Sequence, residues 1–216
     1  MNALPNAKLW TLAAMLRDTA NFELTATNEQ VKPNYRRAML NNNFTPFPIL
    51  TTDRLILRQL ETTDDKDIFI HRSDDIINRY LEDFRHADLE QTQAWIDRVQ
   101  KEIMEGKTIL WVITQKGVNK FIGTVCLWNI SKDESKAETG YILNTEFHRM
   151  GYMNEALVKT IDFGFNTVKL KTIEAYTHEK NDSSIKLLLR NKFKQGTPQK
   201  EVSSNRIFFS LTNETA

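Results

Sequence analysis

The sequence has little cysteine and almost no excess of charge of either sign. Its 216 residues contain one cysteine, Cys126, so no disulfide can form within the chain and an oxidising compartment is not implied. Twenty-nine basic and 28 acidic residues give a net charge of +1, which provides no long-range attraction to nucleic acid or to an anionic membrane. We therefore expect no nucleic-acid partner, and we expect Cys126 to be a buried, inert thiol.

Long apolar runs are also missing, since none approaches the ~20 residues of a membrane span. The short run Leu9–Leu16 follows helical spacing and ends at Arg17 and Asp18, which indicates an amphipathic helix rather than a signal peptide. We therefore expect a soluble, cytoplasmic protein with no membrane partner. The patterns of phosphate loops, paired cysteines, His-Glu-x-x-His and Gly-x-Ser-x-Gly are absent too, so we expect no metal and disfavour hydrolase chemistry.

The first 48 residues differ from the rest of the chain. They contain one short helical pattern and then polar sequence with Pro33, Pro46 and Pro48, which break regular structure. The sequence therefore predicts an N-terminal extension and linker over residues 1–48, followed by one compact domain over residues 49–216.

Residues 49–216 predict a mixed α/β (α+β) fold. Runs of branched apolar residues predict strands, and amphipathic stretches predict helices. The predicted strands are 54–60, 108–114, 120–128, 136–143, 172–177 and 206–212, and the predicted helices begin near Thr62 or span 88–105, 151–165 and 183–191. Short links make the three middle strands antiparallel, whereas the helix after 136–143 makes that strand parallel to 172–177. We expect a mostly antiparallel sheet flanked by helices.

The stretch from Ala137 to Leu157 carries the strongest chemical signal. A strand, Ala137-Glu-Thr-Gly-Tyr-Ile-Leu-Asn144, leads into a turn, and a helix begins at or beside Gly151. The first backbone N–H groups of a helix have no intrahelical partner, and glycine lets a diphosphate approach them closely. The sequence therefore predicts an anion site at the start of this helix.

This stretch resembles the acetyl-coenzyme A (acetyl-CoA) motif of the GNAT superfamily of N-acetyltransferases, and it is most similar to the ribosomal-protein N-terminal acetyltransferase branch (the RimJ/RimL type). The resemblance lies in Glu138, Gly140-Tyr141, Gly151-Tyr152 and Glu155-Ala156-Leu157, and it extends to Leu50–Arg58 and to Asn181–Ser184 with Phe193. It implies a GNAT fold and acetyl-CoA as cosubstrate. The cofactor-binding residues that it implies are Ile142, Leu143, His148, Arg149, Met150, Gly151, Tyr152, Met153, Asn154, Asn181 and Ser184.

The sequence departs from the family pattern at four positions. His148 replaces the usual first residue of the glycine motif, and Met153 replaces a small residue, but neither change removes a backbone donor. Lys192 stands where a glycine usually precedes the phenylalanine, and Leu188 stands where many GNAT enzymes have a tyrosine that protonates the thiolate. We therefore expect another residue to protonate the leaving thiolate.

The resemblance implies that Ser184 is the proton donor and that Glu138 is the base that accepts the amine proton, directly or through water. His178 and Glu179 are rival bases, and capping of the following helix is the alternative role for Ser184. A free α-amino group has a pKa of about 7.7 to 8.0, against about 10.4 for lysine, so it needs only a weak base. The acceptor is therefore expected to be a protein or peptide N-terminal α-amine.

Other interpretations stay open. The acids between Glu61 and Asp75 either attract a cationic amine or stabilise helix starts, and Lys186 and Arg190 either meet the 3′-phosphate of coenzyme A or form a solvated helix face. The acceptor is alternatively a polyamine, an amino sugar or an antibiotic amine, and the protein is alternatively a non-catalytic acyl-CoA sensor. Either a monomer or a homodimer is compatible with the sequence.

Overall fold

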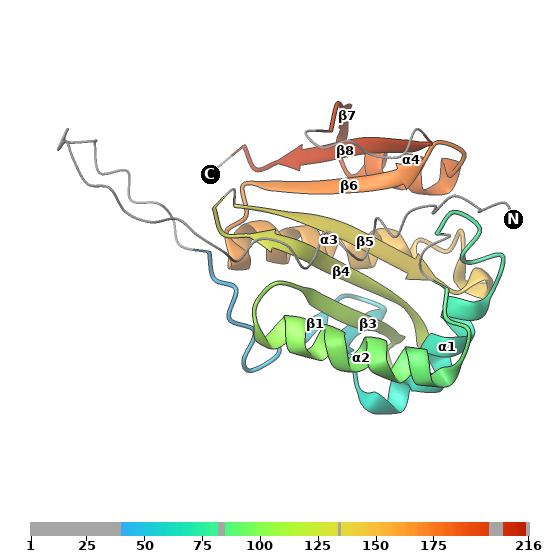
Figure 1. The fold of residues 1–216 in the computed structure, drawn as a ribbon. Coiled ribbons are helices and arrows are strands. Elements are labelled where there is room, and N and C mark those ends of the chain that lie inside the picture. Colours follow the sequence, from blue (N-terminus) through green and yellow to red (C-terminus); the bar gives the residue numbers. More distant parts are fainter. Residues whose placement is uncertain (1–39, 82–84, 134, 199–204, 215–216) are drawn as a thin grey trace, which may run out of the picture. The chain divides into compact units, whose positions relative to one another are not determined.

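The computed structural model describes residues 40–81, 85–133, 135–198 and 205–214. Within them, one sheet has the strand order β1-β2-β3-β4-β5-β6-β8-β7 (Figure 1). The strands are β1 (Leu50–Thr51), β2 (Leu55–Gln59), β3 (Ile109–Gln115), β4 (Phe121–Ser131), β5 (Lys136–Leu143), β6 (Thr172–His178), β7 (Lys194–Gly196) and β8 (Arg206–Thr212). The helices are α1 (Asp65–Ser73), α2 (Leu89–Met104), α3 (Tyr152–Phe163) and α4 (Asp182–Arg190), with the 3₁₀ turns η2 (Thr62–Asp64) and η4 (Thr145–Phe147) and the π-helical turn η5 (Gly164–Val168).

The strand pairing confirms the predicted mixed sheet. All neighbouring strands are antiparallel except β5 and β6, which are parallel because α3 returns the chain across the sheet between them. Each strand and helix predicted within residues 49–216 is present, with its ends shifted by three residues at most. The sequence does not predict β1 and β7, because two or three residues are too few to show an alternation.

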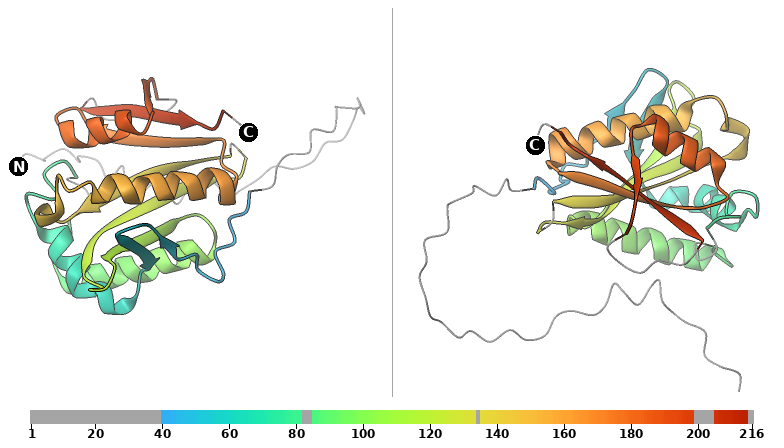
Figure 2. Two further views of the ribbon diagram at one scale, coloured as in Figure 1. Left: turned by 180° about the vertical axis from the view of Figure 1, so that it is seen from behind. Right: turned by 90° about the horizontal axis from the view of Figure 1, so that it is seen from above.

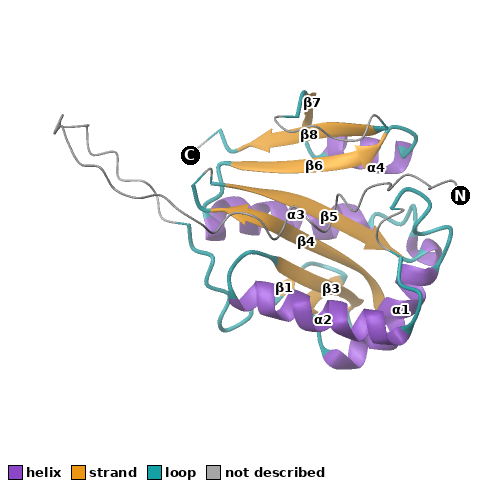
Figure 3. Ribbon diagram, viewed as in Figure 1, coloured by secondary structure: helices purple, strands orange, loops and turns teal. Residues whose placement is uncertain are grey.

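The helices cover both faces of the sheet. Helix α2 lies across one face with α1 beside it, whereas α3 and α4 lie on the other face (Figures 2 and 3). Strand β3 is accordingly buried on both sides, from Ile109 to Thr114. No helix in the described ranges has the length and apolar character needed to cross a membrane.

Residues 40–48, which the sequence predicts as linker, pack against the domain instead. Phe44 is only 5% exposed, and its ring centroid lies 6.3 Å from that of Phe163. The indole nitrogen of Trp111 donates a hydrogen bond of 2.8 Å to the Pro48 carbonyl. The packed domain therefore begins before residue 49, and apolar side chains rather than prolines mark its edge. The helix predicted at Leu9–Leu16 lies outside the described residues.

Candidate active site

Strands β5 and β6 part towards their carboxyl ends. Their register is limited to three pairs: Lys136 with Thr172, Ala137 with Ile173, and Glu138 with Glu174. Further along, β5 remains paired with β4 and β6 with β8, so the facing edges of β5 and β6 have no strand partner in the described sheet. Backbone N–H and C=O groups along this gap are therefore available to a ligand.

A cavity of about 800 Å³ occupies the gap and the space beyond it. Its walls come from the ends of β5 and β6, from η4 and the starts of α3 and α4, and from residues 76–81 after α1. The cavity is thus lined from both faces of the sheet, because its lining includes residues that follow α1 and residues of α3 and α4. All predicted cofactor residues line it except Met150, whereas the predicted base Glu138 does not.

The turn before α3 presents a row of free backbone donors. Arg149 and Gly151 have φ angles of +62° and +81°, and Gly151 is the N-cap of α3 without a side-chain cap. Within the described residues, the N–H groups of residues 149–154 donate no hydrogen bond. Such a turn at a helix start favours an anion, so these residues fit the diphosphate of coenzyme A.

Arg54 holds this turn in place, a role that the sequence does not reveal. Its guanidinium donates to the Met150 carbonyl at 3.0 Å and to the Glu155 carboxylate at 2.7 Å, and it lies 4.4 Å from the centroid of the Tyr152 ring. The same carboxylate accepts the Thr52 hydroxyl. Burial alone would raise the pKa of Glu155, but hydrogen bonds from Thr52 and Arg54 outweigh burial and hold that pKa below its usual value. Glu155 is therefore ionised in the folded protein at neutral pH.

The end of β5 is fixed by a close strand approach and by a histidine. A Cβ atom on Gly123 would lie 2.3 Å from the Ile142 carbonyl oxygen, so this contact requires glycine. The Nε2 atom of His148 lies 2.9 Å from the Leu143 carbonyl oxygen. Because a carbonyl only accepts, Nε2 donates in this contact. His148 therefore anchors the end of the strand where the resemblance places the thioester.

Ser184 and Tyr141 meet across the gap between α4 and β5. Their hydroxyl oxygens lie 2.8 Å apart, and both residues line the cavity. Burial raises the pKa of Tyr141 to about 12, so its hydroxyl is protonated at neutral pH. Asn181 caps α4 by accepting the Ser184 N–H at 3.2 Å. Leu188, which stands where many GNAT enzymes have a tyrosine, is a core residue, and the tyrosine beside Ser184 is Tyr141 of β5.

The three candidate bases occupy different surroundings. The Glu138 carboxylate accepts a hydrogen bond of 2.9 Å from the Asn129 side chain, outside the cavity. His178 lines the cavity, and its Nδ1 accepts the Lys180 N–H at 3.0 Å. Glu179 is exposed and is not part of the lining. The structure therefore brings Ser184 and His178 to the cavity but not the two carboxylates.

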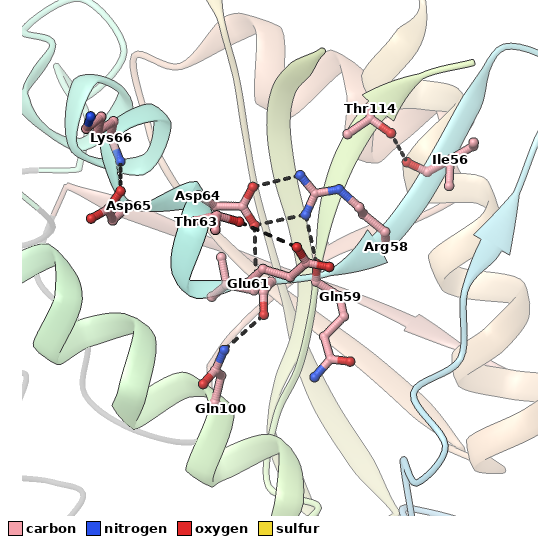
Figure 4. Close-up of polar contacts among 11 residues, drawn as sticks. Ile56, Arg58, Gln59, Glu61, Thr63, Asp64, Asp65, Lys66, Gln100 and Thr114 are labelled. Atoms are coloured by element: carbon pink, nitrogen blue, oxygen red, sulfur yellow. Dashed lines mark hydrogen bonds and ion pairs between the residues drawn. The ribbon is translucent and has the colours of Figure 1, made fainter. Parts of the chain in front are cut away.

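None of the acids between Glu61 and Asp75 lines the cavity. The buried carboxylate of Asp64 pairs with Arg58 at 2.7 Å and accepts the Glu61 N–H at 2.8 Å (Figure 4). Asp74 accepts two backbone N–H groups of the following turn, each at 2.8 Å. These contacts support the structural interpretation of the acids and give no support to their attracting a cationic amine.

Basic residues predominate along the cavity wall. The lining contains the single acid Asp182 and six lysines or arginines, namely Arg79, Arg149, Lys180, Lys186, Arg190 and Arg206. Lys186 and Arg190, for which the sequence leaves open either a contact with the 3′-phosphate or a solvated helix face, are both present in it. This excess of positive charge suits a polyanion such as coenzyme A.

Two further departures from the family pattern are Met153 and Lys192, and the structure shows the surroundings of Met153 and the backbone conformation of Lys192. Met153 is 9% exposed and packs into the core at the start of α3. Lys192 has a φ of +65°, so it adopts the left-handed conformation that glycine adopts most readily.

Cys126 is a free thiol on β4, and its side chain is partly rather than fully buried. Its Sγ atom donates to the Gly140 carbonyl at 3.4 Å. Burial raises the pKa of this thiol to about 12. The expectation of an inert thiol thus agrees with its surroundings, although the side chain is less buried than expected.

Comparison with known proteins identifies the family. A model of the acetyltransferase (GNAT) domain matches residues 54–194. The uncharacterized N-acetyltransferase YoaA of Bacillus subtilis (strain 168) is 33% identical over 149 residues, which cover 69% of this chain and 84% of that protein. The ribosomal-protein-S5-alanine acetyltransferase of Vibrio fischeri has a TM-score of 0.64 and 22% identity, over 77% of this chain and 97% of that chain. RimL, a ribosomal L7/L12 α-N-protein acetyltransferase solved with coenzyme A, has a TM-score of 0.67 and 14% identity, over 78% of this chain and 100% of that chain. The chain therefore belongs to the GNAT family of N-acetyltransferases.

Proposed function

We propose that this enzyme transfers the acetyl group of acetyl-CoA to the N-terminal α-amine of a protein or peptide by direct attack in a ternary complex. The observation that carries the proposal is the single cavity that joins the free N–H groups before α3 to the Tyr141–Ser184 hydroxyl pair. Two structural neighbours are named as ribosomal-protein acetyltransferases, which supports a protein acceptor. A cytoplasmic monomer or homodimer without a nucleic-acid partner belongs to the same proposal.

The cofactor side of the proposal uses main chain and basic side chains. The N–H groups of residues 149–154 hold the diphosphate, and Lys186 and Arg190 meet the 3′-phosphate. Asn181 and the unpaired edges of β5 and β6 hydrogen-bond the amide groups of the pantetheine arm. Backbone N–H groups at Ile142 and Leu143 stabilise the negative charge that develops on the carbonyl oxygen. When bound, acetyl-CoA supplies an activated thioester and a thiolate leaving group.

Proton supply is assigned to the hydroxyl pair. Tyr141 is protonated and its hydroxyl lies 2.8 Å from that of Ser184. In the proposed relay Tyr141 donates to the serine oxygen, and the serine proton goes to the thiolate. As Ser184 gives up its proton it receives that of Tyr141, so no serine alkoxide accumulates. The proton that the attacking amine loses then restores Tyr141 through solvent.

Removal of the amine proton is assigned to Glu138 through water. Its carboxylate lies outside the cavity, so a direct contact with the amine is not part of the proposal. An α-amine with a pKa of about 7.7 to 8.0 is already partly neutral near pH 7, so a relayed base is sufficient.

The decisive test is a thiol-release screen with acetyl-CoA, in which peptides with free N-termini are compared with polyamines, amino sugars and antibiotic amines. The proposal requires peptides to give the highest kcat/KM. A small amine as the best acceptor would overturn the protein-acceptor proposal. Calorimetric binding of acetyl-CoA without thiol release from any amine would instead establish a non-catalytic sensor.

A further inference from the structure

Cationic and aromatic side chains line one side of the cavity, and the proposed reaction gives them no role. They are Arg79 and Tyr80 from the connection after α1, His178 from the end of β6, and Arg206 from the start of β8. The Tyr80 and His178 ring centroids lie 5.2 Å apart, and the Arg79 guanidinium carbon lies 5.0 Å from the centroid of the Tyr80 ring. These four residues are called the mouth cluster below.

The mouth cluster lies on the face of the sheet opposite to α3 and α4. Arg206 is the direct cross-strand partner of His178, so the two side chains share one face. Tyr80, which follows α1, contacts His178 from that same face. Tyr141 faces the other side, because its hydroxyl meets Ser184 of α4. The phosphates of coenzyme A, assigned to the α3 turn and to α4, therefore leave the mouth cluster free.

The mouth cluster contains two guanidinium groups, which can only donate hydrogen bonds. None of the ion pairs among the described residues involves Arg79 or Arg206, so neither guanidinium is neutralised by a carboxylate there. The Nδ1 atom of His178 accepts the Lys180 N–H at 3.0 Å, which leaves the proton of the neutral ring on Nε2. Two guanidinium groups and a ring N–H suit a carboxylate or a phosphate and repel a cation.

We infer that the mouth cluster binds an anionic group of the amine acceptor, and that the acceptors are peptides with acidic residues directly after the N-terminal amine. The inference rests on the proposed function, because the mouth cluster must share the cavity with the thioester. Polyamines and other polycations are disfavoured by the same charges. A phosphate on a small amine has equivalent chemistry, so the experiment must separate the two sources.

The test compares two peptides that share an N-terminal alanine and differ only at positions two to four. One carries aspartate and glutamate there, and the other carries asparagine and glutamine. With saturating acetyl-CoA, we expect kcat/KM to be roughly tenfold or more higher for the acidic peptide, and salt to reduce this ratio. In the double variant Arg79→Gln/Arg206→Gln, the ratio should fall to near one. The control Lys132→Gln removes an exposed charge outside the cavity and should keep the wild-type ratio.

The outcomes separate the inference from the proposed function. Equal acetylation of both peptides by the wild type overturns the inference and leaves the proposed function standing. Acetylation of neither peptide overturns the proposed function. In that case, the wild type and the double variant are compared with glucosamine 6-phosphate and glucosamine as acceptors. If the wild type prefers the phosphorylated sugar and the double variant does not, the mouth cluster binds a phosphate rather than a peptide carboxylate. Isothermal titration of both peptides into the coenzyme A complex gives a readout independent of turnover, and equal or absent binding of the two contradicts the inference.

Discussion

The Tyr141 hydroxyl on β5 lies 2.8 Å from the Ser184 hydroxyl in the first turn of α4, across the gap where the parallel strands part. If the pair relays a proton to the thiolate, Tyr141→Phe should lower kcat by roughly a hundredfold and leave the KM for acetyl-CoA nearly unchanged, because the phenyl ring still fills the same space. Steady-state kinetics by thiol release would measure both constants.

A double-mutant cycle distinguishes a relay from two independent effects. Ser184→Ala should lower kcat at least as much as Tyr141→Phe, and adding Tyr141→Phe to it should cause almost no further loss. Multiplicative losses in the double variant would show that the two hydroxyl groups do not act in series.

The positive φ of Gly151 gives a second prediction. Gly151→Ala should destabilise the protein by about 1 to 2 kcal/mol and weaken coenzyme A binding, because alanine disfavours a φ of +81° in the turn that presents the N–H groups. Gly117→Ala is the matched control, since Gly117 has a φ of +83° with open space around it and does not line the cavity. It should cause a similar loss of stability with unchanged coenzyme A binding by calorimetry. Equal binding losses in both variants would contradict a specific role of the turn.

Glu155 should contribute stability that depends on pH. Its folded pKa lies below the usual value, so its stabilising effect is present above the unfolded pKa of about 4.3 and is lost as the pH falls through the folded pKa. Glu155→Gln should therefore lower the free energy of unfolding by about 1 to 3 kcal/mol near neutral pH, because Arg54 and Thr52 lose a charged acceptor. Urea unfolding at several pH values should show the two proteins converging in acid. A difference that is constant with pH would contradict this account.

Glu138 as a water-relayed base predicts a pH-dependent defect. Glu138→Gln should lower kcat/KM for a peptide by roughly tenfold near pH 7 and much less above about pH 9, where the α-amine is neutral without assistance. Rates measured across this range would decide the point. An identical profile for variant and wild type would exclude Glu138 from proton removal.

The alternation of β5 explains why the sequence predicts the fold better than the site. The periodicity of residues 136–143 is enough to place the strand, and the helix that follows is enough to make its pairing with β6 parallel. However, Glu138 and Tyr141 lie three positions apart and so point to opposite faces of the sheet. If Ser184 is the proton donor and lies on the α4 side of the sheet, the alternation of side chains along β5 favours Tyr141 as its neighbour. The same alternation places Glu138 on the opposite face of the sheet.

Other features depend on contacts that no local pattern reveals. The hydrogen bond of Arg54 to the Met150 carbonyl joins residues 96 positions apart, and the ring contact of Tyr80 with His178 joins the connection after α1 to the end of β6. The acids after β2 show the reverse case, in which a charge pattern suggests a ligand but local capping and the Arg58–Asp64 pair account for it. The sequence therefore predicts local features such as strands, helices and helix caps. The contact partners of each site residue depend on tertiary contacts and can be identified only in the folded structure.

The raised pKa of Cys126 also has a consequence for assays: we expect the Cys126 thiol to react only slowly with thiol reagents. A thiol whose pKa is raised this far above its usual value is almost entirely protonated at pH 8, and the chain has no second cysteine. A colour-forming disulfide reagent can consequently stay in the cuvette throughout turnover, and every sulfhydryl it reports comes from coenzyme A.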